Sequence, residues 1–243
     1  MNDMQTAIAL SSMIENHMMP QEFTLQLTKA LIPAGVNICF AGLSDSGKCN
    51  VLLTSIKEGM GPDERIVTNI DQCREISCHN EEVTVDNILR LAKETDPHRI
   101  VVDLKSSEIL EVSEILESMP WVSLVAAVYA DNVEQLRFKI WKMFAARRIS
   151  IPEEYLDQQI NEMFDVVLFF KKMWSGQRVL DSVVEVGLGE YRVIYSFNYN
   201  AYEKSLGSSP MFIWEMGQYF SSEFSAKITA RSGCFVPGKP TIS

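Results

Sequence analysis

"AGLSDSGKCN", Ala41 to Asn50, is the stretch of sequence that decides the fold. It begins inside an apolar run, "VNICFAG" (Val36–Gly42), which predicts a buried strand, and it runs into "CNVLLTSIKEGM", which predicts a helix. It departs by one residue from the phosphate-loop pattern G-x-x-x-x-G-K-[ST], because the last position is Cys49. In such a loop, backbone N–H groups and the helix N-terminus surround phosphates, and the lysine pairs with their charge. The flanking strand and helix favour a phosphate loop over an ordinary glycine-rich turn.

The loop supplies the candidate nucleotide-binding residues. They are Gly42, Ser44, Asp45, Ser46, Gly47, Lys48, Cys49 and Asn50. A serine or threonine at the position of Cys49 gives its hydroxyl to magnesium, and a thiol is a poor substitute because thiols prefer softer metals. A later apolar run, "RIVVD", ends in Asp103, which could hold magnesium through water. The alternative for Asp103 is a helix-capping role after the strand. Cys49 and Asp103 are thus the candidate metal residues.

The remaining pattern predicts an α/β fold with a mainly parallel sheet and helices on both faces, because strands and helices alternate. The predicted strands are 36–42, 65–70, 99–104 and 123–130, and the predicted helices are 49–60, 84–96, 107–119, 132–148 and 151–164. An antiparallel meander is predicted at 165–173, 178–187 and 190–199, and a last amphipathic helix from about Ile213 to Arg231. We expect a helical lead-in (1–34), a nucleotide-binding core (35–150) and an extension of the same domain (151–243), with a loose tail.

Composition limits the class of protein. The net charge of −10 argues against general nucleic-acid binding, which uses a basic face. The odd count of five cysteines fits reduced thiols in a cytosol rather than a disulfide framework. No signal-peptide pattern opens the sequence, and no apolar stretch approaches the roughly 20 residues that a membrane span needs. We therefore expect a cytoplasmic location.

Two further features have competing interpretations. Cys49 would be a nucleophile if the helix N-terminus and Lys48 lowered its pKa, although no histidine lies near it in sequence. "RFKIWKMFAARR" mixes basic and aromatic residues on a predicted helix. It could contact acidic lipid or a partner, but aromatic residues at helical spacing more often face the core, and we expect this of Phe138, Trp141 and Phe144.

The order of the motifs resembles the C-terminal domain of the secretion and pilus-assembly traffic ATPases, nearest to the tight-adherence (Flp) pilus and type IV secretion branch. The segments that carry the resemblance are "GLSDSGKC", "PDERIVTNIDQCREI", "DPHRIVVDLKSSEIL" and "LVAAVYADNVEQL", and it extends from about Gln21 to Arg231. It implies a RecA-like fold, ATP and Mg²⁺ as ligands, a ring that is commonly a hexamer, and an inner-membrane platform protein as partner. It also implies a cytoplasmic position docked at the inner membrane.

The resemblance also assigns roles. Lys48 would hold the β- and γ-phosphates, Asp103 would hold water-bound magnesium, and Asp71 would help to position water. Several family residues are replaced: Cys49 and Asn50 stand for two threonines, and Tyr129 stands for a histidine. The glutamate of the acidic box is lost, and Asp103 with Lys105 is the nearest equivalent of the usual glycine and glutamate after the third strand.

These replacements bear on catalysis. The resemblance also implies an N-terminal domain that closes over the nucleotide and supplies arginines; we expect it to be missing from this stretch of sequence, whether or not the gene encodes it. Losing one positioned group costs about 10²–10³ in rate. We therefore expect an ATP-binding protein with weak or lost hydrolysis. The alternative is a non-hydrolysing scaffold subunit that binds a partner ATPase or the membrane platform.

Overall fold

The computed structural model describes residues 10–76, 82–84, 86–187 and 190–232. The helices are α1 (Leu10–Glu15), α2 (Gln21–Gln26), the π-helical turn η1 (Leu27–Leu31), α3 (Lys48–Gly59), the 3₁₀ turn η2 (Asp71–Ile76), α4 (Ile88–Thr95), α5 (Ile109–Ser118), α6 (Val133–Ala146), α7 (Glu153–Met163), α8 (Tyr199–Ser205) and α9 (Ser222–Ser232). The strands are β1 (Ile38–Gly42), β2 (Ile66–Thr68), β3 (Arg99–Asp103), β4 (Ser123–Val128), β5 (Val166–Lys172), β6 (Arg178–Gly187), β7 (Glu190–Phe197) and β8 (Trp214–Met216).

All these strands join one sheet in the order β2-β3-β4-β1-β5-β6-β7-β8. The pairs from β2 to β5 are parallel, and β6, β7 and β8 continue the sheet in antiparallel pairs. This is the predicted α/β class, with a mainly parallel sheet followed by an antiparallel meander. Parallel strands need crossover helices, whereas the antiparallel strands β5 and β6 are joined by a short turn; helix α8 lies between β7 and β8.

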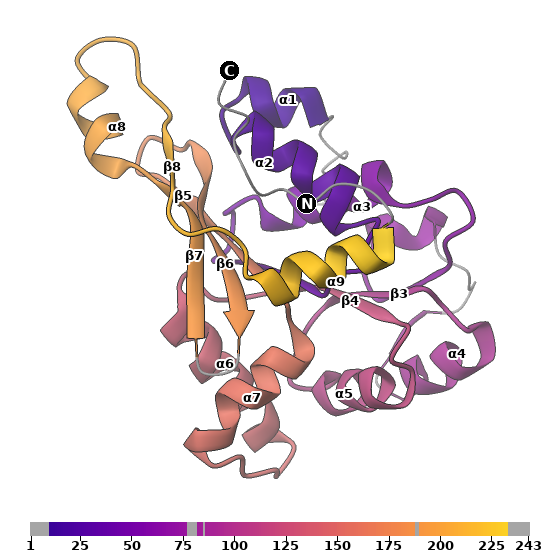
Figure 1. The fold of residues 1–243 in the computed structure, drawn as a ribbon. Coiled ribbons are helices and arrows are strands. Elements are labelled where there is room, and N and C mark those ends of the chain that lie inside the picture. Colours follow the sequence, from indigo (N-terminus) through magenta and orange to yellow (C-terminus); the bar gives the residue numbers. More distant parts are fainter. Residues whose placement is uncertain (1–9, 77–81, 85, 188–189, 233–243) are drawn as a thin grey trace.

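The central strands are buried on both faces, which is why they read as continuous apolar runs. In β1, Ile38 and Phe40 face one core cluster and Cys39 and Ala41 face the other. Helices α1, α2, α3 and α9 cover the first face, and α4 to α7 cover the second. Figure 1 shows these two helical layers above and below the sheet. No helix in the part of the chain that the structure describes combines the length and apolarity that a membrane crossing requires.

The predicted last helix is wrong in its first half. Trp214–Met216 is strand β8, and a helix begins only at Ser222. Pairing with β7 overrides the helical pattern: Gly217 donates its N–H to the carbonyl of Ile194, and a Cβ at Gly217 would lie 2.6 Å from the carbonyl oxygen of Val193. The third meander strand also ends earlier than predicted, at Phe197, before α8. The tail expected to be loose, 233–243, lies outside the described residues, as do 1–9 of the helical lead-in.

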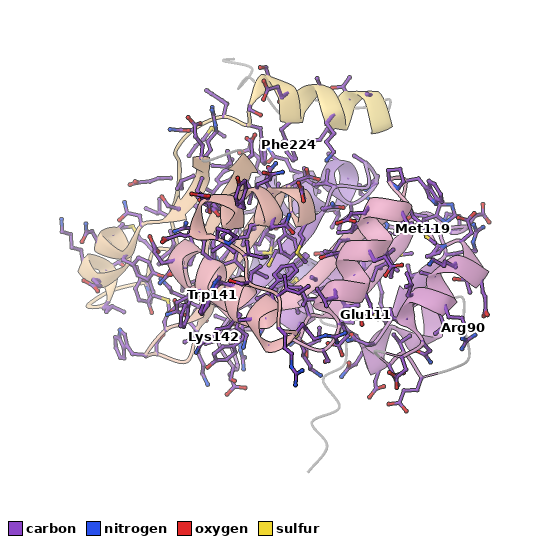
Figure 2. The ribbon with its side chains drawn as sticks, turned by 90° about the horizontal axis from the view of Figure 1, so that it is seen from below. Arg90, Glu111, Met119, Trp141, Lys142 and Phe224 are labelled. Carbon is purple, nitrogen blue, oxygen red and sulfur yellow. The ribbon has the colours of Figure 1, made fainter. Side chains whose placement is uncertain are left out.

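Helix α6 corrects a second expectation. Phe144 is buried, as predicted, but Phe138 and Trp141 are 55% and 40% exposed and stack on each other with ring centres 6.1 Å apart. Lys142 lies 4.4 Å from the Phe138 ring centre, and Figure 2 shows Trp141 and Lys142 projecting from this helix. Only one side of α6 packs against the core, and Phe138 and Trp141 lie outside that buried side.

Candidate nucleotide-binding site

The loop after β1 lies where the direction of the crossovers reverses. Helix α3, which follows β1, packs on one face of the sheet, and α6, which follows the adjacent strand β4, packs on the other. The carboxyl ends of β1 and β4 therefore form a topological switch point, the place where open α/β sheets bind ligands.

The loop backbone explains its two glycines. A Cβ at Gly42 would lie 2.3 Å from Ser46 Oγ and 2.8 Å from the carbonyl oxygen of Phe170, so no side chain fits there. Gly47 has a φ of 87°, in the left-handed region that glycine adopts without strain. Asp45 is also left-handed, with a φ of 60°, a conformation that aspartate tolerates better than most residues. Asp45 and Gly47 are thus two left-handed residues separated only by Ser46, in the turn between β1 and α3.

Lys48 is the first residue of α3. Its ammonium group donates a long hydrogen bond, 3.4 Å, to the carbonyl oxygen of Leu43, and lies 5.9 Å from the ring centre of Tyr129. Tyr129 follows β4 at the position where the resemblance expects a histidine, and Lys139 of α6 lies at the same distance from its ring. Neither contact of Lys48 involves a carboxylate, so its charge is available to an incoming anion.

The other loop residues divide by burial. Ser44 and Asp45 are exposed, whereas Ser46 and Asn50 are buried. The Ser46 hydroxyl has no hydrogen-bond partner among the described residues. It fills the space that a side chain at Gly42 would need. The Ser46 hydroxyl therefore lies inside the loop, against Gly42, and is not exposed to a ligand.

The thiol of Cys49 has a raised pKa. Desolvation is the main cause; the positive charge of Lys48 opposes it and the negative charge of Asp103 adds to it. The prediction that the helix N-terminus and Lys48 lower the pKa of Cys49 is therefore wrong. Cys49 as a whole residue is nevertheless exposed. At neutral pH Cys49 remains a protonated thiol, a weak nucleophile and a poor ligand for a hard cation.

Asp103 ends β3 beside the same site. Its carboxylate is exposed and forms an ion pair with Lys105 at 3.8 Å. Its backbone is fixed by Asn69 after β2: Asp103 N donates to Asn69 Oδ1 at 2.8 Å, and Asn69 Nδ2 donates to Asp103 O at 3.2 Å. Helix α5 begins only at Ile109, with Glu108 as its N-cap, so Asp103 does not cap it.

Asp71 lies farther from the loop. It begins η2 after β2, at the outer edge of the sheet, with β3 and β4 between β2 and β1. Three strand spacings of about 4.8 Å make roughly 14 Å between β2 and β1. The structure thus brings Lys48 and Asp103 close enough for their charges to act on the Cys49 thiol. It places Asp71 at the same carboxyl end of the sheet, but farther from the loop. Among the described residues, no three His, Cys, Asp or Glu side chains gather as a metal site.

Two residues near the loop had not been predicted. Arg178 at the start of β6 donates from Nε to the carbonyl oxygen of Asp45 at 2.8 Å. Lys172 at the end of β5 lies 3.9 Å from the Asp45 carboxylate. The signal for them was the basic pair and arginine on either side of the turn in "KKMWSGQR". The sequence of a turn does not by itself predict which other loop the turn will contact.

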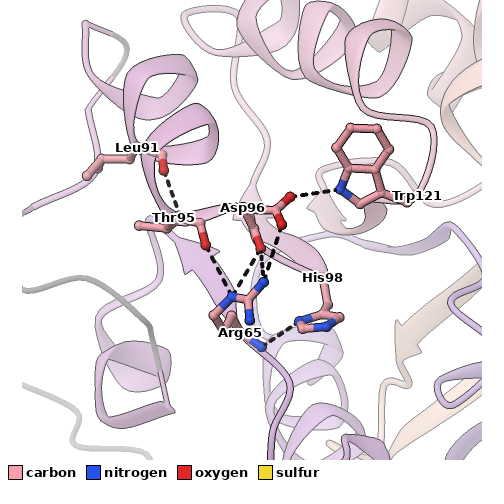
Figure 3. Close-up of polar contacts among 6 residues, drawn as sticks. All are labelled: Arg65, Leu91, Thr95, Asp96, His98 and Trp121. Atoms are coloured by element: carbon pink, nitrogen blue, oxygen red, sulfur yellow. Dashed lines mark hydrogen bonds and ion pairs between the residues drawn. The ribbon is translucent and has the colours of Figure 1, made fainter.

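The opposite edge of the sheet carries a cluster of tightly paired polar groups (Figure 3). Arg65 donates to the carbonyl oxygen of Asp96 at 2.5 Å from Nη2, and its backbone N–H donates to His98 Nδ1 at 3.0 Å. Trp121 Nε1 donates to the Asp96 carboxylate at 3.1 Å. Asp96 ends α4 in the left-handed conformation, with a φ of 44°. These contacts join the end of α4 to the starts of β2 and β3, which is a structural role.

Comparison with known proteins gives structural but no sequence relatives: no family model matches the chain, and no curated protein matches its sequence. The VirB11 ATPase of the Brucella suis type IV secretion system, solved in complex with sulphate, has a TM-score of 0.55 at 17% identity. That match covers 75% of this chain and 57% of that one.

Two further solved structures are similar at lower scores. The Legionella pneumophila ATPase DotB has a TM-score of 0.49 at 16% identity, over 84% of this chain and 55% of that one. The pilus retraction motor PilT with bound ADP has a TM-score of 0.48 at 13% identity, over 74% and 52%. The chain thus spans little more than half the length of these proteins. The likeness to VirB11 shows a shared RecA-like fold and confirms, at that level, the resemblance predicted from the motifs.

Proposed function

We propose that this chain is the nucleotide-binding domain of a motor-type ATPase of a secretion or pilus-assembly system, and that it binds ATP with weak or no hydrolysis. The observation that carries the proposal is the loop from Gly42 to Lys48 at the switch point of the sheet. This loop has no room for a side chain at Gly42 and has a left-handed backbone at Asp45 and Gly47. Backbone N–H groups at such a loop and helix N-terminus bind phosphate. Lys48 would hold the β- and γ-phosphates, since its present contacts are weak.

The loop fits phosphate better than it fits magnesium. Bound magnesium would neutralise phosphate charge, with Asp103 as its water-mediated partner and Cys49 at the usual hydroxyl position. The raised pKa of Cys49 keeps its sulfur protonated, and a thiol is a poor ligand for this cation. Asp71 would position water, but it starts three strand spacings from the loop strand. These features support weak hydrolysis.

A second candidate is a non-hydrolysing scaffold that binds a partner ATPase or a membrane platform protein. Tyr129 favours it, because a phenol at the end of β4 cannot carry the positive charge that a histidine could bring to a γ-phosphate. For either candidate we propose a cytoplasmic protein, peripheral at the inner membrane, in a homo- or hetero-oligomeric ring that is commonly a hexamer. No role with nucleic acid is proposed.

Titration with a fluorescent ATP analogue, followed by a phosphate-release assay, tests the proposal. Replacing Lys48 with alanine should weaken binding by at least about tenfold, the effect of losing a charged hydrogen bond. Lys93→Ala is the matched control, because Lys93 lies on α4 in an exposed pair with Glu114. Binding that Lys48→Ala leaves unchanged would contradict the proposed site. Binding with no phosphate release favours the scaffold, and release abolished by Lys48→Ala favours the enzyme.

A further inference from the structure

Asp45 places a carboxylate in a loop proposed to hold phosphates. Its side chain is 70% exposed, and its backbone is left-handed, with a φ of 60°. A carboxylate beside a bound phosphate is repulsive, and a non-glycine residue in this conformation persists only when its surroundings hold it. A contact from outside the loop that holds the Asp45 backbone and offsets its charge would therefore favour both this loop conformation and phosphate binding.

The hairpin of β5 and β6 provides both. Lys172 and Arg178 are directly opposite each other in the antiparallel register, one on each strand. Arg178 Nε donates to the backbone carbonyl of Asp45 at 2.8 Å, and Lys172 Nζ lies 3.9 Å from its carboxylate. The two cations thus contact two different groups of the same loop residue.

The peptide between Asp45 and Ser46 is held at both of its polar groups. Its carbonyl accepts from Arg178, and its N–H, which belongs to Ser46, donates to the carbonyl of Leu43 at 3.3 Å. A peptide unit is planar, so fixing both groups fixes the plane that holds the Cα atoms of Asp45 and Ser46, immediately before Gly47.

The side chain of Arg178 also forms one wall of the loop. A Cβ at Gly47 would lie 2.9 Å from Arg178 Cδ and 2.9 Å from Met18 Cε. Met18 is itself tied to the hairpin, because its carbonyl accepts from Leu180 N at 2.6 Å. The loop therefore cannot move toward the hairpin without displacing Arg178.

We propose that Arg178 is a positioning residue of the phosphate loop, acting through the Asp45 carbonyl, and that Lys172 is the counter-charge that makes Asp45 compatible with a bound phosphate. The proposal rests on the proposed nucleotide-binding function. The Lys172–Asp45 pair is exposed and contributes little to stability. Its effect is on binding, where it offsets a negative charge beside the phosphates.

Three substitutions separate the hydrogen bond of Arg178 from its charge. In Arg178→Gln, the amide nitrogen is bonded to Cδ, as Nε is in arginine, so the donor remains and the charge is lost. In Arg178→Lys, the charge remains and a methylene stands at the place of Nε. Arg178→Ala loses both. Arg90→Ala is the control, because Arg90 lies on α4 in an exposed pair with Glu94.

Hydrogen exchange over residues 43–50 in the nucleotide-free protein tests the positioning role, with far-UV circular dichroism to verify folding. Arg178→Ala and Arg178→Lys should raise the exchange rate about tenfold, as expected for one lost hydrogen bond to a charged donor. Arg178→Gln should raise it clearly less than Arg178→Ala does, because a neutral donor remains, and Arg90→Ala should exchange like the wild type. Protection retained by Lys and lost in Gln, or no change in any Arg178 variant, would overturn the role.

The counter-charge role is tested by a double-mutant cycle with the fluorescent ATP analogue. Lys172→Ala should weaken binding about fivefold in the wild-type background and have no effect in Asp45→Gly, because the carboxylate is then gone. An equal loss in both backgrounds would overturn it. A wild-type chain that binds no analogue overturns the proposed function and the counter-charge role with it, whereas the exchange rates still decide the role of Arg178.

Discussion

The charged side chains at the two ends of the parallel strands, here called the amino edge and the carboxyl edge, have opposite environments. At the amino edge, Arg99 has a side chain only 3% exposed and donates to both oxygens of Glu64, at 2.5 and 3.1 Å. At the carboxyl edge, Lys48 has one long hydrogen bond of 3.4 Å, and the Asp103–Lys105 pair is exposed at 3.8 Å. The first edge uses its charges to hold strands and helices together. At the second edge, Lys48 and the Asp103–Lys105 pair make only long contacts, so a ligand can displace them.

The largest expected effect comes from breaking the amino-edge pair. Glu64→Ala leaves the Arg99 guanidinium buried without its partner and should lower the free energy of unfolding by about 3 kcal/mol. Urea unfolding measures it. The control, Glu114→Ala, removes an exposed partner of Lys93 and should cost less than about 0.5 kcal/mol. Equal costs would show that burial does not distinguish the pairs.

A pair of glycines sharpens the contrast between fold and site. Gly47 and Gly176 have φ values of 87° and 86°, but a Cβ at Gly176 would meet nothing within 4 Å. Alanine at either position should cost about 1–2 kcal/mol of stability, from the left-handed backbone. Only Gly47→Ala should also lose binding of the fluorescent ATP analogue. The account fails if Gly176→Ala loses binding to the same extent.

The smallest effect is on the chemistry of Cys49. Its raised pKa predicts slow alkylation by iodoacetamide at neutral pH, with a rate that still rises beyond about pH 8.5, the ordinary thiol value. Lys48 lowers this pKa, so Lys48→Ala should slow alkylation; Asp103 raises it, so Asp103→Asn should speed it. Mass spectrometry of the peptide that contains Cys49 gives the rate. Opposite signs would mean that the three groups do not share one edge.

The sequence predicts features that are local in the chain. The strand, loop and helix around Lys48 lie within a few residues, and each central strand shows its own burial by its apolar run. Strand β8 could not be predicted in this way, because its conformation depends on pairing with β7 rather than on its own pattern. Likewise Arg178 lies 133 residues from Asp45 and meets it only once β5 and β6 have joined the sheet.

The exposed aromatic residues of α6 follow the same reasoning. Helical spacing predicted that Phe138, Trp141 and Phe144 face the core, but spacing alone does not determine the width of the buried side of a helix. Only Phe144 reaches the core. The raised pKa of Cys49 also depends on a distant residue, Asp103, and on desolvation that no sequence pattern reports.

The central claim is a retained phosphate loop with a weakened magnesium site, and the magnesium dependence of ATP binding tests it most directly. The fluorescent ATP analogue is titrated with and without magnesium into the wild type and Cys49→Thr, and phosphate release is followed in both. The account predicts wild-type affinity that magnesium does not change, with affinity and release in Cys49→Thr that magnesium raises. Wild-type binding and phosphate release that both depend on magnesium, unchanged by Cys49→Thr, would contradict it.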